Sequence, residues 1–186
     1  PVERALDREV GRVLSAQFET QQVDKTYLAV VRGHPEEAGV IDHPLTRQYD
    51  DYEFRAPDTV GEAQSAITRY RRLATVELPY RVDRYPTSRY ALLELKPETG
   101  RRHQLRRHLK HLAHPIIGDA TYGKGRHNRL FQELFGCHRL LLACLEMRLT
   151  HPLSGEPLTL TAPLADDFVS VLDALGREKP GQPKLA

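Results

Sequence analysis

Cysteine is scarce in this sequence, with only Cys137 and Cys144 among 186 residues. The two do not form a CxxC motif, and Cys144 lies in an apolar run, which is typical of a buried small hydrophobic residue. Two such cysteines do not provide the dense disulfide framework of small secreted domains. The cysteine content therefore favours a reducing compartment, and we expect a cytoplasmic protein.

Long hydrophobic runs are also missing from the sequence. No apolar stretch approaches the ~20 residues that a membrane-spanning helix requires, and the first residues lack the pattern of a secretory signal peptide. We therefore expect no membrane partner. The sequence opens at Pro1 without a methionine, from which we expect that residue 1 is not the natural start of the protein.

The composition is that of one ordinary folded domain. Hydrophobic residues make up 40% of the chain and charged residues 28%, which is enough for a core beneath a polar surface. We place this domain at residues 1–175. The polar stretch at residues 176–186 is expected to be a disordered tail.

Hydrophobic periodicity divides the chain into helices and strands. Apolar residues at helical spacing predict helices at residues 7–21, 102–112 and 166–175. Runs rich in β-branched, aromatic and aliphatic residues predict strands at residues 25–31, 66–78, 88–95, 139–149 and 158–161. The polar stretch at residues 46–62 is expected to be a loop or insertion. Strands in hairpins with a few helices indicate an α+β fold, with a mainly antiparallel mixed sheet and flanking helices.

A basic stretch without any acid is the most informative part of the chain. Helical spacing places a stripe of leucines beside a cationic face, so that Arg106 lies at the boundary between solvent and core. A guanidinium at such a boundary needs a carboxylate or phosphate partner. The run is either the electrostatic footprint of a phosphate-backbone partner or an ordinary solvated helix face. Its cations are Arg101, Arg102, Arg106, Arg107 and Lys110.

Three motifs in a fixed order resemble one known family. TGRRHQLRRH followed by HPIIGDATYG, within residues 99–123, resembles the third motif of the RluA-type pseudouridine synthases. KTYLAVVRG at residues 25–33 resembles their second motif, and the stretch at residues 139–163 resembles their C-terminal strands. The segments YRRLATVELP, RYPTSRY and RRHLKHLAHPIIGD are most similar to members that modify tRNA.

The resemblance implies a fold, a reaction and a substrate. The chain would be the C-terminal portion of a pseudouridine synthase catalytic domain that acts on tRNA, at uridine 65. In this family an aspartate attacks the target nucleoside, and the base detaches, rotates and rejoins through carbon. The uridine must leave its stack to reach the pocket. No metal, nucleotide or redox cofactor is implied, and no obligate protein partner is inferred.

The resemblance also implies roles for individual residues. Arg106 matches the family arginine that pairs with the catalytic carboxylate and keeps it ionised. Tyr27 matches the tyrosine that packs on the base, although a strand aromatic taken by itself would be interpreted as core packing. Leu105 matches an apolar residue of the pocket. The remaining substrate-binding candidates are Arg102, Arg107 and Lys110, which would contact phosphates and position RNA without reading its sequence, and His103 and Gln104, which we expect to bond to backbone or to the RNA.

The motif that carries the family's nucleophile, approximately HRLD followed by TSG, does not occur in the printed sequence. The nearest likeness surrounds Asp7, which lacks the following Thr-Ser-Gly and lies only eleven residues before Phe18, about half the distance at which the family's nucleophile precedes that helix position. We interpret Asp7 as the N-cap of that helix. We expect the nucleophile on a segment upstream of Pro1 that supplies a central strand, and we expect this chain alone to be inactive.

Other candidate sites have simpler interpretations. The histidines of residues 103–114 stand among cations, and no cysteine or carboxylate completes a ligand set in that segment, so we expect no metal. Asp119 is interpreted as a turn aspartate that binds local backbone. A second hypothesis is a non-catalytic RNA-binding module that uses the arginine-rich helix, and a third is an α+β domain whose basic helix binds a protein.

Overall fold

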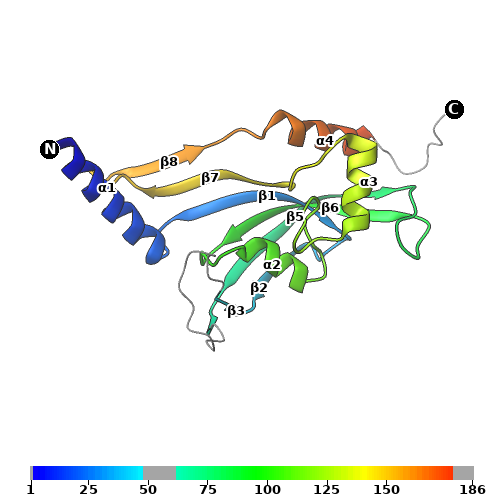
Figure 1. The fold of residues 1–186 in the computed structure, drawn as a ribbon, viewed down its shortest axis with the longest axis horizontal. Helices are drawn as coiled ribbons and strands as arrows, with labels where there is room; N and C mark the ends of the chain where they lie inside the picture. The colour runs from blue at the N-terminus through cyan, green and yellow to red at the C-terminus, as the bar shows by residue number, and fades with distance from the viewer. Residues whose placement is uncertain (1, 48–61, 178–186) are drawn as a thin grey trace.

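The computed structural model describes residues 2–47 and 62–177. They form one six-stranded sheet in the order β2-β5-β6-β1-β7-β8, with helices around it (Figure 1). Every pairing in that sheet is antiparallel, which confirms the predicted α+β class. Its strands are β1 (Asp24–Arg32), β2 (Ala38–Asp42), β5 (Ile67–Leu78), β6 (Ser88–Pro97), β7 (Leu142–Thr150) and β8 (Pro157–Thr161). The short strands β3 (Leu45–Thr46) and β4 (Ala63–Gln64) pair separately.

Each face of the sheet has its own hydrophobic core, because side chains alternate along a strand. On one face, Ala29 and Val31 of β1 pack with Leu109 of α2 (Gln104–His111). On the other face, Val30 packs with Phe131 of α3 (Gly125–Phe135) and with residues of α4 (Asp166–Arg177). The predicted leucine stripe of α2 is therefore confirmed, and β1 lies between the two cores.

The chain returns along β1 after α2, and this return positions the candidate site. The Arg32 backbone N–H donates to the Pro115 carbonyl at 3.0 Å, and the Ile117 N–H donates to the Val30 carbonyl at 2.9 Å. Gly118 follows with φ +81°, and a Cβ there would lie 1.9 Å from the Arg139 carbonyl oxygen. Only glycine fits this position. The turn delivers the next residue to the side of α2.

The first helix begins earlier than the sequence predicts. The helix α1 (Val2–Glu19) includes Asp7, so the interpretation of Asp7 as an N-cap is wrong. Residues 2–6 contain no proline or glycine that would stop the helix before that point. Gln17 joins α1 to β7, because its amide donates to the Thr150 carbonyl at 2.8 Å and accepts from the Thr150 N–H at 2.9 Å. No helix in the described residues is long and apolar enough to cross a membrane.

Several other boundaries also differ from the predictions. The helix expected from residue 102 begins at Gln104, because His103 adopts a left-handed conformation with φ 52°. Arg102 therefore does not share a helical face with the later cations. The strands β2, β3 and β4 and the helix α3 were not predicted, and Cys144 is half-buried rather than buried. The expected tail is helical up to Arg177, while its remainder and residues 48–61 of the expected loop lie outside the described residues.

Candidate active site

Tyr27 lies on β1, in the middle of the sheet, on the face that α2 covers. It faces Leu95 of β6 and Cys144 of β7, next to an irregularity in the β1–β7 pairing. It packs against the core cluster that contains Leu105, which is 7% exposed. Burial, with a further contribution from the neighbouring Cys144, raises the pKa of Tyr27 to about 12. The phenol is therefore neutral at pH 7.

Gln104 fixes the turn that leads into α2. Its amide oxygen accepts from the Thr99 hydroxyl at 2.7 Å and from the Arg101 N–H at 2.9 Å. Its amide nitrogen donates to the Ile67 carbonyl at 2.9 Å and to the Thr68 hydroxyl at 3.0 Å. The side chain is 4% exposed, and these four bonds use its full hydrogen-bonding capacity. Gln104 thus faces the protein interior, whereas the sequence suggested a contact with substrate.

Arg106 and Asp119 form the central ion pair of the site. Nε of Arg106 donates to one carboxylate oxygen and Nη2 to the other, both at 2.7 Å. The arginine side chain is 19% exposed and the aspartate side chain 1%. The carboxylate also accepts from the backbone N–H groups of Thr121 and Tyr122 at 2.9 and 2.8 Å. The expected turn role of Asp119 is confirmed, but the same residue is also the partner of Arg106.

This partner adds to the expectation about Arg106. The family resemblance implies a carboxylate partner upstream of the printed chain, and the structure shows a further one, Asp119, thirteen positions later. The pairing depends on the return of the chain along β1, which no local pattern encodes. Asp119 occupies only two of the five guanidinium N–H groups. Within the part of the chain that the structure describes, the other three have no hydrogen-bond partner.

The charges of this pair are strongly fixed. Burial works to raise the pKa of Asp119, but the hydrogen bonds from Arg106 and from the Tyr122 and Thr121 N–H groups outweigh it, and the pKa is lowered. The hydrogen bond to Asp119 raises the pKa of Arg106. Both groups are therefore ionised at neutral pH. A carboxylate so occupied by donors is a poor nucleophile, so Asp119 serves to hold Arg106 in place.

Tyr122, for which no role was predicted, lies between the cations of the site. Its ring centroid lies 5.0 Å from Cζ of Arg106 and 5.7 Å from Nζ of Lys110. Its hydroxyl lies 3.2 Å from Nδ1 of His103. Although His103 is exposed, partial desolvation and the positive charge of Arg106 lower its pKa. Within HPIIGDATYG the tyrosine was visible, but its spacing alone did not indicate that it meets α2.

Arg107 and Lys110 line a small open hollow next to this tyrosine. The hollow has a volume of about 240 Å³, and none of the described residues that line it carries a carboxylate. Arg107 is half-buried and donates from Nη1 to the Thr46 carbonyl at 3.0 Å, while Lys110 is exposed. Arg102 is also exposed, outside the helix. The three predicted phosphate contacts thus remain near the protein surface, and two of them share one hollow.

The histidines of this segment have partners within the protein. The His108 ring is buried between the Thr68 hydroxyl, at 2.9 Å, and the His43 carbonyl, at 3.0 Å. Burial lowers the pKa of His108. His111 stacks on the His43 ring with centroids 3.6 Å apart. These contacts give both α2 histidines a structural role.

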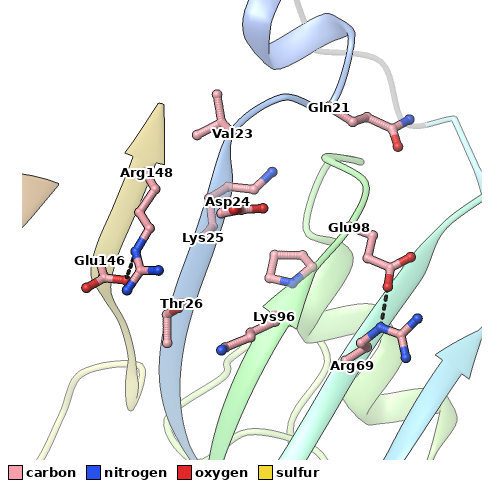
Figure 2. A pocket seen from close by; sticks show the side chains of 11 residues that line it. Gln21, Val23, Asp24, Lys25, Thr26, Arg69, Lys96, Glu98, Glu146 and Arg148 are labelled. Atoms are coloured by element: carbon pink, nitrogen blue, oxygen red, sulfur yellow. Dashed lines mark hydrogen bonds and ion pairs between the residues drawn. The ribbon is translucent and has the colours of Figure 1, made fainter. Parts of the chain in front are cut away.

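A second hollow, of about 440 Å³, lies where β1 begins, beside α1 (Figure 2). Its cations alternate with acids. Arg69 pairs with Glu98, and Arg148 pairs with Glu146 at 2.8 Å. Since neighbouring carboxylates neutralise these guanidinium groups, this hollow suits a polyanion less well than the hollow on α2, whose described lining residues include no acid.

Comparison with known proteins supports this assignment of motifs. The family model for RNA pseudouridylate synthase matches residues 4–111. A protein of Pectobacterium carotovorum subsp. carotovorum named tRNA pseudouridine synthase C is 54% identical over 160 residues, covering 85% of this chain and 42% of that protein. A Vibrio cholerae protein of the same name is 45% identical over 172 residues, covering 92% of this chain and 70% of that protein. The chain thus spans less than half of the first relative's length.

Solved structures show the same fold. Human RNA Pseudouridylate Synthase Domain Containing 4 has a TM-score of 0.61 and 29% identity, over 90% of this chain and 67% of that one. Human RNA Pseudouridylate Synthase Domain Containing 1, at 23% identity, is similar in fold, with a TM-score of 0.59 over 88% of this chain and 69% of that one. The predicted family resemblance is confirmed: this chain belongs to the RNA pseudouridylate synthase family.

Proposed function

We propose that the complete protein converts a uridine of tRNA, uridine 65, to pseudouridine in the cytoplasm. The reaction breaks the bond between N1 of the base and C1′ of the ribose and forms a bond from C5 to C1′. The base loses a proton at C5 and gains one at N1, so the reaction needs no external electron donor or acceptor. The names of the bacterial relatives support tRNA as the substrate.

The Arg106–Asp119 pair carries this proposal. Asp119 holds the guanidinium at the edge of α2 with two hydrogen bonds. The other three N–H groups of Arg106 have no hydrogen-bond partner among the described residues. We assign these groups to the nucleophilic aspartate, on a segment upstream of Pro1. In this arrangement Arg106 is catalytic because it orients and stabilises the attacking carboxylate, and Asp119 is a positioning residue.

The neighbouring side chains suit a base that has left its stack. Tyr27 offers a neutral aromatic ring, and Leu105 belongs to the apolar cluster against which that ring packs. We assign the flipped uracil to this wall, and we assign phosphate contacts to Arg102, Arg107 and Lys110. His103 is exposed and completes this RNA-facing set, whereas Gln104 acts from the interior by holding the turn.

The test uses the complete gene product and an unmodified tRNA transcript. Pseudouridine is mapped by carbodiimide labelling and primer extension, and turnover is followed by release of tritium from C5. We expect one modified position, at uridine 65, with no added metal or nucleotide. The 186-residue chain alone is expected to bind tRNA without modifying it.

Two variants separate chemistry from binding. Arg106→Ala should abolish turnover with a small change in tRNA affinity, and Arg12→Ala, which removes an exposed cation of α1, should behave as wild type. Absence of pseudouridine in every tRNA incubated with the complete wild-type protein would refute the proposed function. Tight tRNA binding without turnover would instead favour the non-catalytic RNA-binding module.

A further inference from the structure

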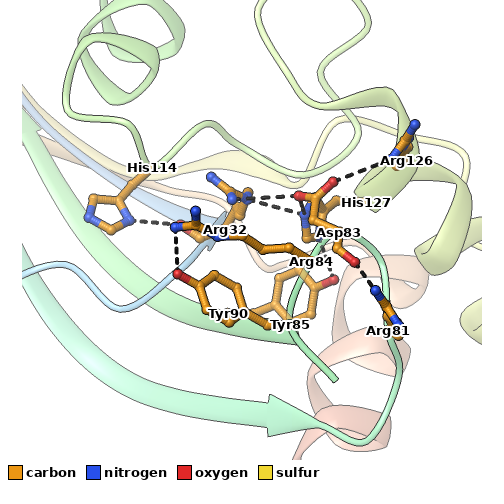
Figure 3. Close-up of polar contacts among 9 residues, drawn as sticks. All are labelled: Arg32, Arg81, Asp83, Arg84, Tyr85, Tyr90, His114, Arg126 and His127. Carbon is orange, nitrogen blue, oxygen red and sulfur yellow. Dashed lines mark hydrogen bonds and ion pairs between the residues drawn. The ribbon is translucent and has the colours of Figure 1, made fainter. Parts of the chain in front are cut away.

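A second arginine-rich surface lies away from the candidate active site, at residues 79–87 between β5 and β6 (Figure 3). This hairpin connection stands beside α3, on the side of the molecule where α2 ends. Residues of this connection line a hollow of about 590 Å³. Ala113 and His114, directly after α2, line the same hollow. Neither the reaction proposed above nor the two cores accounts for this surface.

One carboxylate fixes the hairpin to the body of the protein. Asp83 lies 3.6 Å from Nη2 of Arg32, 3.7 Å from Nη1 of Arg126 and 3.3 Å from Nε2 of His127. Nδ1 of His127 in turn lies 2.8 Å from the hydroxyl of the buried Tyr90 (Figure 3). Burial lowers the pKa of His127 and raises that of Tyr90 to about 12, so both rings are neutral at pH 7. The base of the hairpin is therefore held in a defined position.

The outer part of the hairpin presents an exposed aromatic ring beside two arginines. Tyr85 is 57% exposed, and Cζ of Arg84 lies 4.7 Å from its ring centroid. Nη2 of Arg84 donates to the Tyr85 hydroxyl at 2.6 Å, and Nε of Arg81 donates to the Asp83 carbonyl at 3.2 Å. In residues 2–47 and 62–177, neither guanidinium has a carboxylate partner. Two uncompensated cations beside an exposed ring contribute little to stability but are the combination that binds single-stranded nucleic acid.

We propose that the 79–87 hairpin is a second RNA subsite, which binds an unpaired nucleotide of the substrate. The base stacks on Tyr85, and the adjoining phosphates lie beside Arg81 and Arg84, with Arg126 at the edge. The hollow of about 590 Å³ that Tyr85 helps to line has room for a nucleoside. This inference rests on the proposed function, because it adds a contact for the same RNA.

The position of the subsite allows one RNA to reach both places. Arg106 lies in the first turn of α2, and the hollow begins just after its last turn. The eight residues of α2 rise by about 12 Å, a span of only a few nucleotides. The subsite can therefore orient the RNA while its target uridine enters the active site.

The absence of tryptophan from the chain permits a direct test in the complete protein. Tyr85→Trp introduces an indole at the proposed stacking position. Any tryptophan that the complete protein carries outside this chain is replaced by phenylalanine, so that the fluorescence comes from the new indole alone. We expect tRNA to quench this indole, while a fully paired RNA duplex of equal length does not. Phe18→Trp, at an exposed ring of α1, is the matched control and should not be quenched.

Affinity measurements complete the test. Tyr85→Ala should weaken tRNA binding about tenfold, and Tyr85→Phe, which keeps the ring, should bind within a factor of two of wild type. Unchanged affinity of Tyr85→Ala together with an unquenched indole would overturn the subsite. Equal quenching by the duplex, or quenching by polyglutamate but not by RNA, would also overturn it. Failure of the wild-type protein to modify any tRNA would refute the proposed function instead, and the indole would still report whether RNA binds at the hairpin.

Discussion

Replacement of Asp119 by asparagine is expected to damage the candidate site without changing its shape. The amide oxygen of asparagine can still accept from Thr121, Tyr122 and Nη2 of Arg106, as Oδ1 of Asp119 does. The amide nitrogen, however, takes the place of Oδ2, which accepts from Nε of Arg106 at 2.7 Å. Two donors then face each other, and the guanidinium loses its counter-charge.

The expected loss of stability is about 3 kcal/mol at pH 7, since removal of one partner of a buried ion pair costs about 3–5 kcal/mol. We expect a loss at the low end of this range because the Arg106 side chain is 19% exposed, so water can solvate part of its charge. The matched control is Asp167→Asn, which breaks an exposed pair with Arg139 at 2.8 Å. Surface pairs of this kind contribute about 0–1 kcal/mol.

The pH dependence gives an independent check on the same pair. The pKa of Asp119 is lowered in the folded protein, since the hydrogen bonds from Arg106 and the backbone outweigh the effect of burial. The carboxylate therefore stabilises the fold fully above its unfolded pKa, about 3.9, and loses this contribution as the pH falls through the lower folded value. The difference between wild type and Asp119→Asn should be constant between about pH 5 and pH 7 and shrink below about pH 4.

Urea unfolding at a series of pH values measures this difference, and turnover with tRNA tests its consequence. Because Asp119 holds Arg106 and does not touch RNA, kcat should fall at least tenfold while the Kd for tRNA changes little. A difference in unfolding free energy below about 0.5 kcal/mol at pH 7, no greater than that of Asp167→Asn, would refute the reasoning. So would a wild-type kcat in Asp119→Asn.

Three further outcomes are expected from single substitutions. Lys110→Ala should lower tRNA affinity and reduce the slope of log Kd against log salt by about one, whereas Arg106→Ala should leave that slope nearly unchanged. Filter binding at salt concentrations from about 50 to about 200 mM measures the affinity and the slope of both variants. Gln104→Leu should destabilise the fold by about 2–3 kcal/mol in urea, because it leaves buried donors and acceptors of the turn unpaired. Gly118→Ala should prevent stable folding, as seen by circular dichroism, because its Cβ would meet the Arg139 carbonyl oxygen.

The parts of the fold that follow from periodicity could be predicted from the sequence. The leucine stripe of α2 predicted one face in the core, which agrees with the burial of Leu109, and the strand predicted at residues 25–31 is β1, both faces of which are buried at Val30 and Val31. The helix α3 was missed because its sequence GRHNRLFQELF is mostly polar and lies between Gly123 and Gly136. The strand β2 was missed because it is a short edge strand that contains Gly39 and an exposed Val40.

The site was only partly predictable for a different reason. Arg106 and Tyr27 belong to motifs that can be read locally, whereas Asp119 and Tyr122 reach α2 only because the chain returns along β1. The N-terminus of α2 was likewise misplaced, because the left-handed His103 depends on the hydrogen bonds of Gln104 to a distant strand. Contacts made by tertiary structure are invisible to a window of neighbouring residues.

The start of α2 also has an unusual distribution of charge that bears on function. The N-terminal end of a helix carries a partial positive charge, so acids are favoured there and cations cost about 0.3–1 kcal/mol each. The first turn of α2 has no acid, and it contains both Arg106 and Arg107. Asp119 neutralises Arg106 from outside the helix, while the hydrogen bond that Arg107 donates goes to a neutral carbonyl group, and within residues 2–47 and 62–177 it has no carboxylate partner. The helix end therefore stays positive after folding, and a polyanion such as RNA relieves this charge when it binds. A protein selected for stability alone would place an acid in that turn, so the retained charge argues that the site is built for its ligand.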